Sequence, residues 1–148
     1  MKPLKVLLFI LTLLISLSAV NKEPDLWALF SKTRFTERLN RELSMYFLYP
    51  TFPAELKAMD GKEIILSGFY IPLDFEDDRT IIISKFPMAQ CFFCGGAGSE
   101  SVAVAYLQVK PTKRFKTDQI IKIKGILSLN EKDVDELNFI INNAKIIP

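Results

Sequence analysis

Apolar residues in the first part of the chain recur at the spacing of a helix face. Between residues 21 and 49 the spaced positions are Trp27, Phe30, Leu39, Leu43, Tyr46 and Phe47. Steps of three and four residues are typical of an amphipathic α-helix. Asp25 is expected to cap its start, and Pro50 and Pro53 to end it. With a short helical turn over residues 54–59, the pattern predicts an N-terminal helical segment over residues 21–59.

Beyond the turn at Asp60-Gly61 the pattern changes to that of strands. Branched and aromatic residues fill residues 62–73, 79–86, 101–109, 118–129 and 139–147, with turn residues between them. Five such runs indicate an all-β barrel or sandwich. Gly68 and Gly125 lie inside the first and fourth runs, where glycine suggests a bulge or bend that helps a small barrel to close.

We therefore expect a mainly β (α+β) protein in which residues 60–148 form a five-stranded OB-like barrel. The helical segment would pack on one opening of the barrel. The helix that usually joins the third and fourth strands of this fold is not visible in the pattern. Asn130 is expected to cap a short helix that ends by Leu137.

Residues 1–20 have the pattern of a secretory signal peptide. Lys2 and Lys5 precede an apolar run over residues 6–17, and small residues follow. A membrane span needs ~20 apolar residues, so the run is short for one. The alternative is an uncleaved N-terminal anchor. We expect export to the periplasm or beyond the cytoplasmic membrane, with no stable membrane span after cleavage.

Charge and histidine content exclude several functions. The chain has 19 Lys and Arg against 17 Asp and Glu, and the excess lies in the signal peptide. A nucleic-acid-binding domain is usually strongly basic, so that function is not expected. The chain has no histidine, which excludes Ser-His-Asp and Cys-His catalysis and histidine metal ligation. A c-type haem is also excluded, because Gly95 follows the C-x-x-C pair in place of histidine.

Cys91 and Cys94 are the candidate chemical pair, in a loop over residues 88–101. In an exported protein the pair can form a disulfide, but so short a closed loop gains little stability from it. Use of the pair as a thiol-disulfide catalyst is one interpretation. The glycines that follow, Gly95, Gly96 and Gly98, are a poor start for the helix of a thioredoxin-like site.

The same loop also permits a soft-metal site. Structural zinc needs four nitrogen or sulfur ligands, so two thiolates would require a carboxylate such as Glu100 or a second chain. Copper(I) prefers sulfur, and Met88, Cys91 and Cys94 lie at three-residue steps. Met88 is alternatively an ordinary apolar residue.

A structural interpretation of the loop remains open beside these two. A small disulfide would stiffen the loop, with Phe92 and Phe93 packed inward. Gly95, Gly96 and Gly98 would then allow the turns with positive φ that the loop needs.

Three motifs give a family resemblance over most of the chain. They are G-F-Y-I-P-L with Gly68 and Pro72, the loop around Cys91, and K-G-I-L with Gly125. Together they resemble an exported bacterial family of unknown function, and C-F-F-C-G-G-A-G-S-E-S is similar to its Bacteroidetes-type branch. The broader family has a Cys-x-His-Pro-Pro loop at this point. A Cys/Cys pair in place of Cys/His mildly favours metal binding over redox chemistry. The resemblance implies a fold and a location but no reaction.

These observations lead to one hypothesis and two alternatives. We expect an exported, non-catalytic binding module whose C-x-x-C loop binds zinc or copper or forms a labile disulfide. The alternatives are a thiol-disulfide redox protein and a structural accessory subunit. The expected partners are an envelope protein complex or a second copy of the chain.

Overall fold

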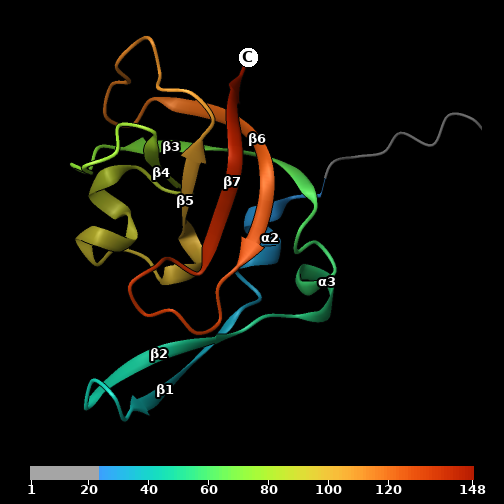
Figure 1. Cartoon of the computed structure of the whole chain (residues 1–148), viewed down its shortest axis with the longest axis vertical. Helices are drawn as coiled ribbons and strands as arrows, with labels where there is room; N and C mark the ends of the chain where they lie inside the picture. The colour runs from blue at the N-terminus through green and yellow to red at the C-terminus, as the bar shows by residue number, and fades with distance from the viewer. Residues whose placement is uncertain (1–23) are drawn as a thin grey trace, which may run out of the picture.

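The computed structural model describes residues 24–148, so the predicted signal peptide lies outside the described residues. Five strands form a closed barrel: β3 (Glu63–Ile71), β4 (Thr80–Ser84), β5 (Val102–Leu107), β6 (Ile120–Leu129) and β7 (Phe139–Ile147). Their order around the barrel is β3-β4-β5-β7-β6, with β3 paired to β6 to close it (Figure 1). Only the β5–β7 pairing is parallel. The mainly β, five-stranded OB-like barrel expected from the sequence is confirmed.

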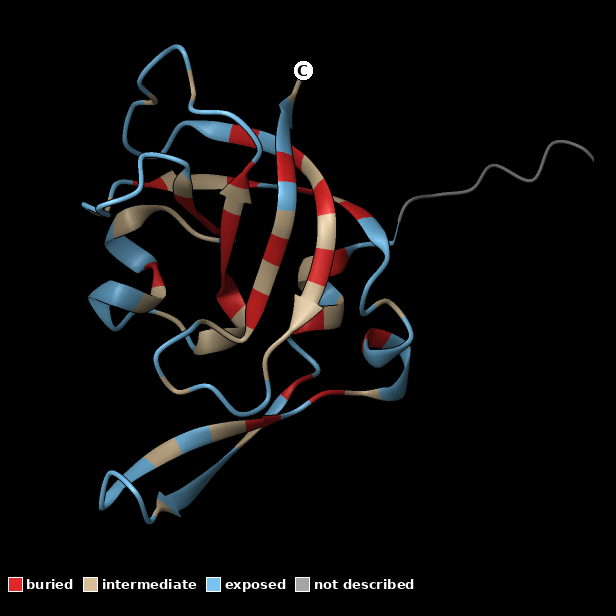
Figure 2. Ribbon diagram, in the orientation of Figure 1, coloured by how far each residue is buried: buried red, intermediate tan, exposed pale blue. Residues whose placement is uncertain are grey.

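Burial along the strands separates an inner core from an outer apolar layer. On β3 and β6, buried positions such as Ile64 and Ile123 alternate with more exposed ones (Figure 2). That alternation places one face in the barrel and the other toward solvent. On β4 and β5 nearly every residue is buried. Ile83 and Ala103 belong to the barrel core, whereas Ile82 belongs to a second cluster. Something must therefore cover the outer face of these two strands.

The two glycines expected to shape the barrel act differently. The pairing of β6 with β7 shifts register between Lys124 and Ile126, so Gly125 lies at the expected bulge. The pairing of β3 with β6 is unbroken at Gly68, so no bulge is present there. A Cβ at Gly68 would lie 2.5 Å from the Ser84 carbonyl oxygen. This glycine is therefore needed for close packing. Pro72 directly follows the end of β3.

The long N-terminal helix predicted from the sequence is wrong beyond residue 30. Helix α2 covers Leu26–Phe30, and a hairpin of β1 (Arg34–Asn40) and β2 (Met45–Thr51) follows it. The Asn40 side chain accepts hydrogen bonds from the backbone N–H groups of Glu42 and Leu43, at 3.0 and 3.1 Å. Such local bonding favours a turn over a helix. Leu39 and Tyr46 are seven positions apart, a spacing that also fits one face of a helix. In the structure they are partners across the hairpin.

The N-terminal helices that do form pack against the barrel core. Asp25 caps α2 as expected, accepting a hydrogen bond from the Ala28 N–H at 3.1 Å. The Phe30 ring stacks on Phe139 of β7 with ring centroids 4.1 Å apart. The expected helical turn after Pro53 is α3 (Ala54–Lys57), and its Leu56 is fully buried in the same cluster.

The loop between β6 and β7 is not the short helix expected from Asn130. The Asn130 side chain accepts hydrogen bonds from the N–H groups of Lys132 and Asp133, at 3.1 and 2.8 Å. It also donates to the Asp133 carbonyl at 2.6 Å. These bonds close a turn on itself, so no helix propagates. The chain between β5 and β6 contains no helix. Within residues 24–148, no helix is long and apolar enough to cross a membrane.

Candidate functional site

The cysteine loop covers the outer face of β4 and β5. It contains three short 3-10 helices, Met88–Gln90, Phe92–Cys94 and Ser99–Ser101. Cys91 is fully buried and forms the second cluster with Ile71, Ile82, Val102 and Val104. Met88 and Phe92 pack against this cluster. Packing against the strands therefore anchors the loop at Cys91.

The two cysteines lie beside each other at different depths. The Cys91 carbonyl accepts hydrogen bonds from the N–H groups of Cys94 and Gly96, both at 3.2 Å. Gly95 between them has φ 74°, the left-handed conformation that favours glycine. The chain thereby turns around Cys91, and Cys94 reaches solvent. Both side chains are free thiols in the structure.

The surroundings of Cys94 do not activate its thiol. Partial desolvation and the neighbouring Cys91 sulfur raise the pKa of Cys94 above the ordinary value of a cysteine. Thiolate is the reactive form of cysteine, and a raised pKa leaves less of it at neutral pH. Cys94 is therefore exposed without being a strong nucleophile.

Of the other expected members of the site, Met88 packs against the same apolar cluster as Cys91. The Glu100 carboxylate lies over Gly98, and Gly96 lies so close to the Gln90 backbone that a Cβ would not fit. Within residues 24–148, no three histidine, cysteine or acidic side chains are grouped to hold a metal ion. Cys91, Cys94 and Glu100 thus form no ligand set within one described chain. The Met88 N–H donates to Asp118 at 2.6 Å.

The structural interpretation placed both phenylalanines of the loop inward, which is correct for Phe92 and wrong for Phe93. Phe92 is half-buried against the second cluster, whereas Phe93 is 42% exposed. The two rings meet edge to face, with centroids 5.3 Å apart. Of the three loop glycines, Gly95 is the one with positive φ. The exposed Phe93 ring points to a role other than core packing.

Phe92 and Phe93 border a groove of about 540 Å³ between the barrel and the hairpin. Its floor is the outer face of β4 and β5. Four strand residues line it there, Thr80, Ile82, Val104 and Tyr106. They lie two apart on each strand and so share one face. The remaining walls come from β2, the β3–β4 loop and the β6–β7 loop.

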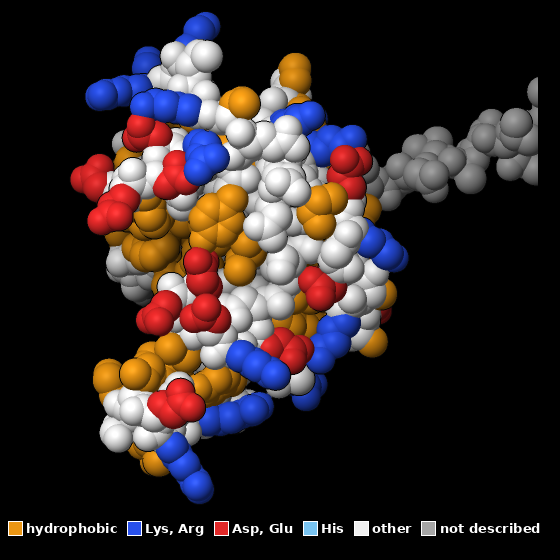
Figure 3. Space-filling model, viewed as in Figure 1, with side chains coloured by type: hydrophobic (Ala, Val, Ile, Leu, Met, Phe, Trp, Pro, Cys, Tyr) orange, Lys and Arg blue, Asp and Glu red, His pale blue; other side chains and the backbone are white. Residues whose placement is uncertain are grey.

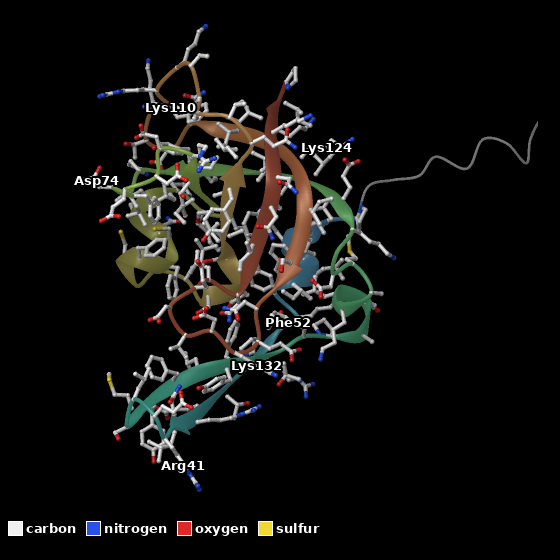
Figure 4. The ribbon with its side chains drawn as sticks, viewed as in Figure 1. Arg41, Phe52, Asp74, Lys110, Lys124 and Lys132 are labelled. Atoms are coloured by element: carbon white, nitrogen blue, oxygen red, sulfur yellow. The ribbon has the colours of Figure 1, made fainter. Side chains whose placement is uncertain are left out.

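The groove runs along the edge of β2. Four consecutive residues of that strand line it, Phe47, Leu48, Tyr49 and Pro50. Successive side chains of a strand point to opposite faces. A cavity in contact with all four therefore follows the edge of the strand. Figure 4 shows Lys132 of the β6–β7 loop close to this strand, and Arg41 at the far end of the hairpin.

Carboxylates surround the groove. Glu76, Asp77, Glu131, Asp133, Asp135 and Glu136 line it, against the single basic residue Lys132. Asp77 pairs with Arg79 and Glu131 pairs with Lys57, each at 2.8 Å. Within residues 24–148, no ion-pair partner lies near Glu76, Asp133 or Asp135. The rim of the groove, formed by these carboxylates and Lys132, therefore has net negative charge.

The carboxylate of Glu136 is hydrogen-bonded to Tyr106 on the floor of the groove. The Tyr106 hydroxyl donates to both oxygens of Glu136, at 2.7 and 2.8 Å. Burial, this hydrogen bond and the charge of Glu136 raise the pKa of Tyr106 to about 12. Tyr106 is therefore neutral at physiological pH and ties β5 to the β6–β7 loop.

Sequence reasoning found the cysteine loop but missed the groove. It also assigned β2, one of the groove's walls, to a helix. A signal was present in Phe92-Phe93, because the side chains of two adjacent residues point in different directions in a strand and in a 3-10 helix alike. The chain matches no protein-family model, and comparisons with curated proteins and with solved structures found no similar protein.

Proposed function

We propose that this protein is an exported, non-catalytic binding module that holds its ligand in the groove between barrel and hairpin. One observation carries the proposal. The two residues that separate Cys91 from Cys94, Phe92 and Phe93, form a wall of a 540 Å³ groove with an apolar floor. Ligand pockets are commonly clefts of ~300–1,000 Å³ with apolar walls and a few polar groups. The β4–β5 face is also the second- and third-strand face on which OB-folds bind ligands.

The state of the thiols supports binding over thiol catalysis. A catalytic cysteine has a lowered pKa, whereas the pKa of Cys94 is raised. Cys91 is fully buried and out of reach of a substrate. The pair is suited to a labile disulfide that holds the loop in one shape. In that step the two thiols lose two protons and two electrons to oxidised glutathione, which becomes two reduced glutathione molecules. A soft metal shared between two chains remains a prediction.

Titration with Nile red, a neutral and planar dye, tests the groove. We expect saturable binding of one dye per chain, and at least about fivefold weaker binding for Phe93→Ser, because one aromatic wall is lost. Val109→Ser is the matched control, since Val109 is 73% exposed and lies outside the groove. Its affinity should stay within about twofold of wild type.

Two results would overturn the binding proposal. One is the absence of saturable dye binding to a protein whose circular dichroism shows the folded barrel. The other is an equal loss of affinity in Phe93→Ser and Val109→Ser, because the dye would then bind exposed apolar residues without preference for the groove.

A further inference from the structure

The hairpin exposes several large apolar side chains. Its exposed large side chains are Leu39, Leu43, Met45, Tyr46 and Leu48, between 48% and 65% exposed. Figure 3 shows hydrophobic side chains over the hairpin and acidic side chains on the barrel loops that face it. An isolated hairpin is marginally stable in water, and a large exposed apolar patch marks an interaction site. The hairpin is therefore suited to contact a partner.

The edge of β2 along the groove is open to another strand. Within the described residues, β2 pairs with β1 alone. In an antiparallel pair, alternate N–H and C=O groups of each strand point away from its partner. An edge of this kind is a template for a further strand. Because the groove follows this edge, an occupant of the groove meets backbone donors and acceptors of β2, except at Pro50, which has no N–H to donate.

The negative charge of the rim favours a ligand with cationic side chains. Glu76, Asp133 and Asp135 have no cationic partner within residues 24–148. The floor of the groove includes the apolar side chains of Ile82 and Val104. An extended chain places alternate side chains on opposite faces. In a segment that alternates apolar and cationic residues, the apolar side chains can face the floor and the cationic side chains can face the rim.

We propose that the groove takes an extended segment of a partner polypeptide, rich in alternating Lys or Arg and apolar residues, as a third strand on β2. This inference rests on the proposed function and names its ligand class. Backbone hydrogen bonds to β2 would supply affinity, and the acidic rim and apolar floor would supply specificity. The partner strand would also cover part of the exposed apolar surface of the hairpin.

The test uses an acetylated and amidated peptide of about eight residues that alternates Lys and Val, titrated by calorimetry and followed by amide NMR shifts. Its acidic counterpart alternates Glu and Val. We expect the Lys peptide to bind with shifts in β2 and the β6–β7 loop. The acidic peptide should bind at least about tenfold more weakly, because the acidic rim repels it.

Backbone methylation tests the added strand itself. In two further peptides, N-methyl groups stand at every lysine or at every valine. Backbone N–H groups of a strand alternate in direction, so one of these two patterns blocks pairing with β2 and the other leaves it intact. We expect one pattern to lose at least about tenfold in affinity relative to the other. Equal affinities would overturn strand addition.

A pair of matched variants tests the charge argument. The double variant Asp133→Asn, Asp135→Asn keeps the size of each side chain and one of its oxygens but removes two charges from the rim. We expect it to bind the Lys peptide about two- to fivefold more weakly. Asp74→Asn is the control, because Asp74 lies on the β3–β4 loop outside the groove lining (Figure 4). Equal effects of both variants would overturn the role of the rim.

The outcomes separate this inference from the proposed function. If Nile red binds with the expected Phe93 dependence while neither peptide binds, the polypeptide ligand is wrong and the binding module stands. Binding of an oligosaccharide such as cellotetraose in place of the Lys peptide would have the same meaning. If sedimentation of the peptide-free protein shows a dimer that Leu48→Lys disrupts, the occupant is a second copy and the inference is overturned.

Discussion

Phe92 and Phe93 reach the groove because the cysteines on either side of them lie at different depths. Cys91 is anchored in the cluster on β4 and β5, and Cys94 is at the surface. The chain between them must therefore rise, and the left-handed turn at Gly95 returns it. The aromatic wall is a consequence of burying one cysteine and exposing the other.

Replacement of Tyr106 by Phe should change how the protein responds to alkali. Its raised pKa, about 12, lies above the ~10 expected in the unfolded chain. The folded state keeps this proton longer, so the contribution of Tyr106 to stability is complete below pH ~10 and is lost as pH rises through ~12. Tyr106→Phe should lose about 1 kcal/mol at neutral pH with the hydrogen bond to Glu136. It should also show a shallower fall in unfolding free energy between about pH 10 and 12.

Urea unfolding at several pH values, with absorbance at 295 nm to follow tyrosine ionisation, measures both effects. An alkaline fall in stability as steep in Tyr106→Phe as in wild type would contradict the assignment. So would an absorbance titration that loses no high-pH step in the variant.

At the scale of elements, the space between strands determines whether a side chain fits at a given position. The local sequence pattern does not reveal that space. β3 pairs with β6 along most of its length and with β4 near its end. Gly68 lies near that change of partner, and the Trp27 ring of α2, which packs against the barrel core, lies close to it. The Trp27 indole N–H donates to the Ser67 carbonyl at 2.8 Å. The N-terminal helix is thus held against β3 at the point where a side chain would not fit.

Gly68→Ala should therefore destabilise the barrel although alanine is a common residue. The new Cβ would meet the Ser84 carbonyl oxygen at 2.5 Å and Ile83 at 2.7 Å, so backbone must move. We expect a loss of about 1–3 kcal/mol in unfolding free energy by urea denaturation. Ser67→Ala, at the exposed neighbouring position, should change stability by less than about 0.5 kcal/mol. A Gly68→Ala variant as stable as Ser67→Ala would refute the packing argument.

At the scale of the whole molecule, a closed barrel carries a hairpin that has little core of its own. Figure 2 shows buried residues concentrated in the barrel and mostly exposed residues along the hairpin. Pro50 and Phe52 are the buried residues that join the end of β2 to the rest of the molecule. The barrel has no open edge, whereas the hairpin keeps its edges open. The proposed binding surface therefore includes the hairpin, which has few buried residues of its own.

Hydrogen exchange should therefore divide the protein into two parts. Amides of β6 and β7 should exchange through global unfolding, and amides of β1 and β2 through local opening that costs much less free energy. Addition of the alternating Lys–Val peptide should slow exchange in β2 more than in β6. Hairpin amides that exchange as slowly as those of the barrel in the free protein would contradict this division.

Much of the barrel was readable from the sequence, and most of the N-terminal region was not. Runs of Ile and Val between turns predicted all five strands, and Gly125 predicted the bulge. The hairpin was missed because Leu39 and Tyr46 fit a helical spacing as well as a cross-strand pair. Asn130 was recognised as a capping residue, but its bonds to residues 132 and 133 close a turn without a helix. The capping role predicted for Asn130 was therefore correct, and the helix predicted to follow it was wrong.

By itself the sequence determined the barrel strands, the absence of histidine chemistry and the cysteine loop as the segment with chemical character. These features depend on residue type and on spacing along the chain. Tertiary structure decided that Cys91 is buried, that Glu100 turns away over Gly98, and that Phe93 faces a groove. The groove combines β2, two barrel strands and loops far apart in sequence. No local pattern encodes their meeting, because it results from how the closed barrel and the hairpin pack against each other.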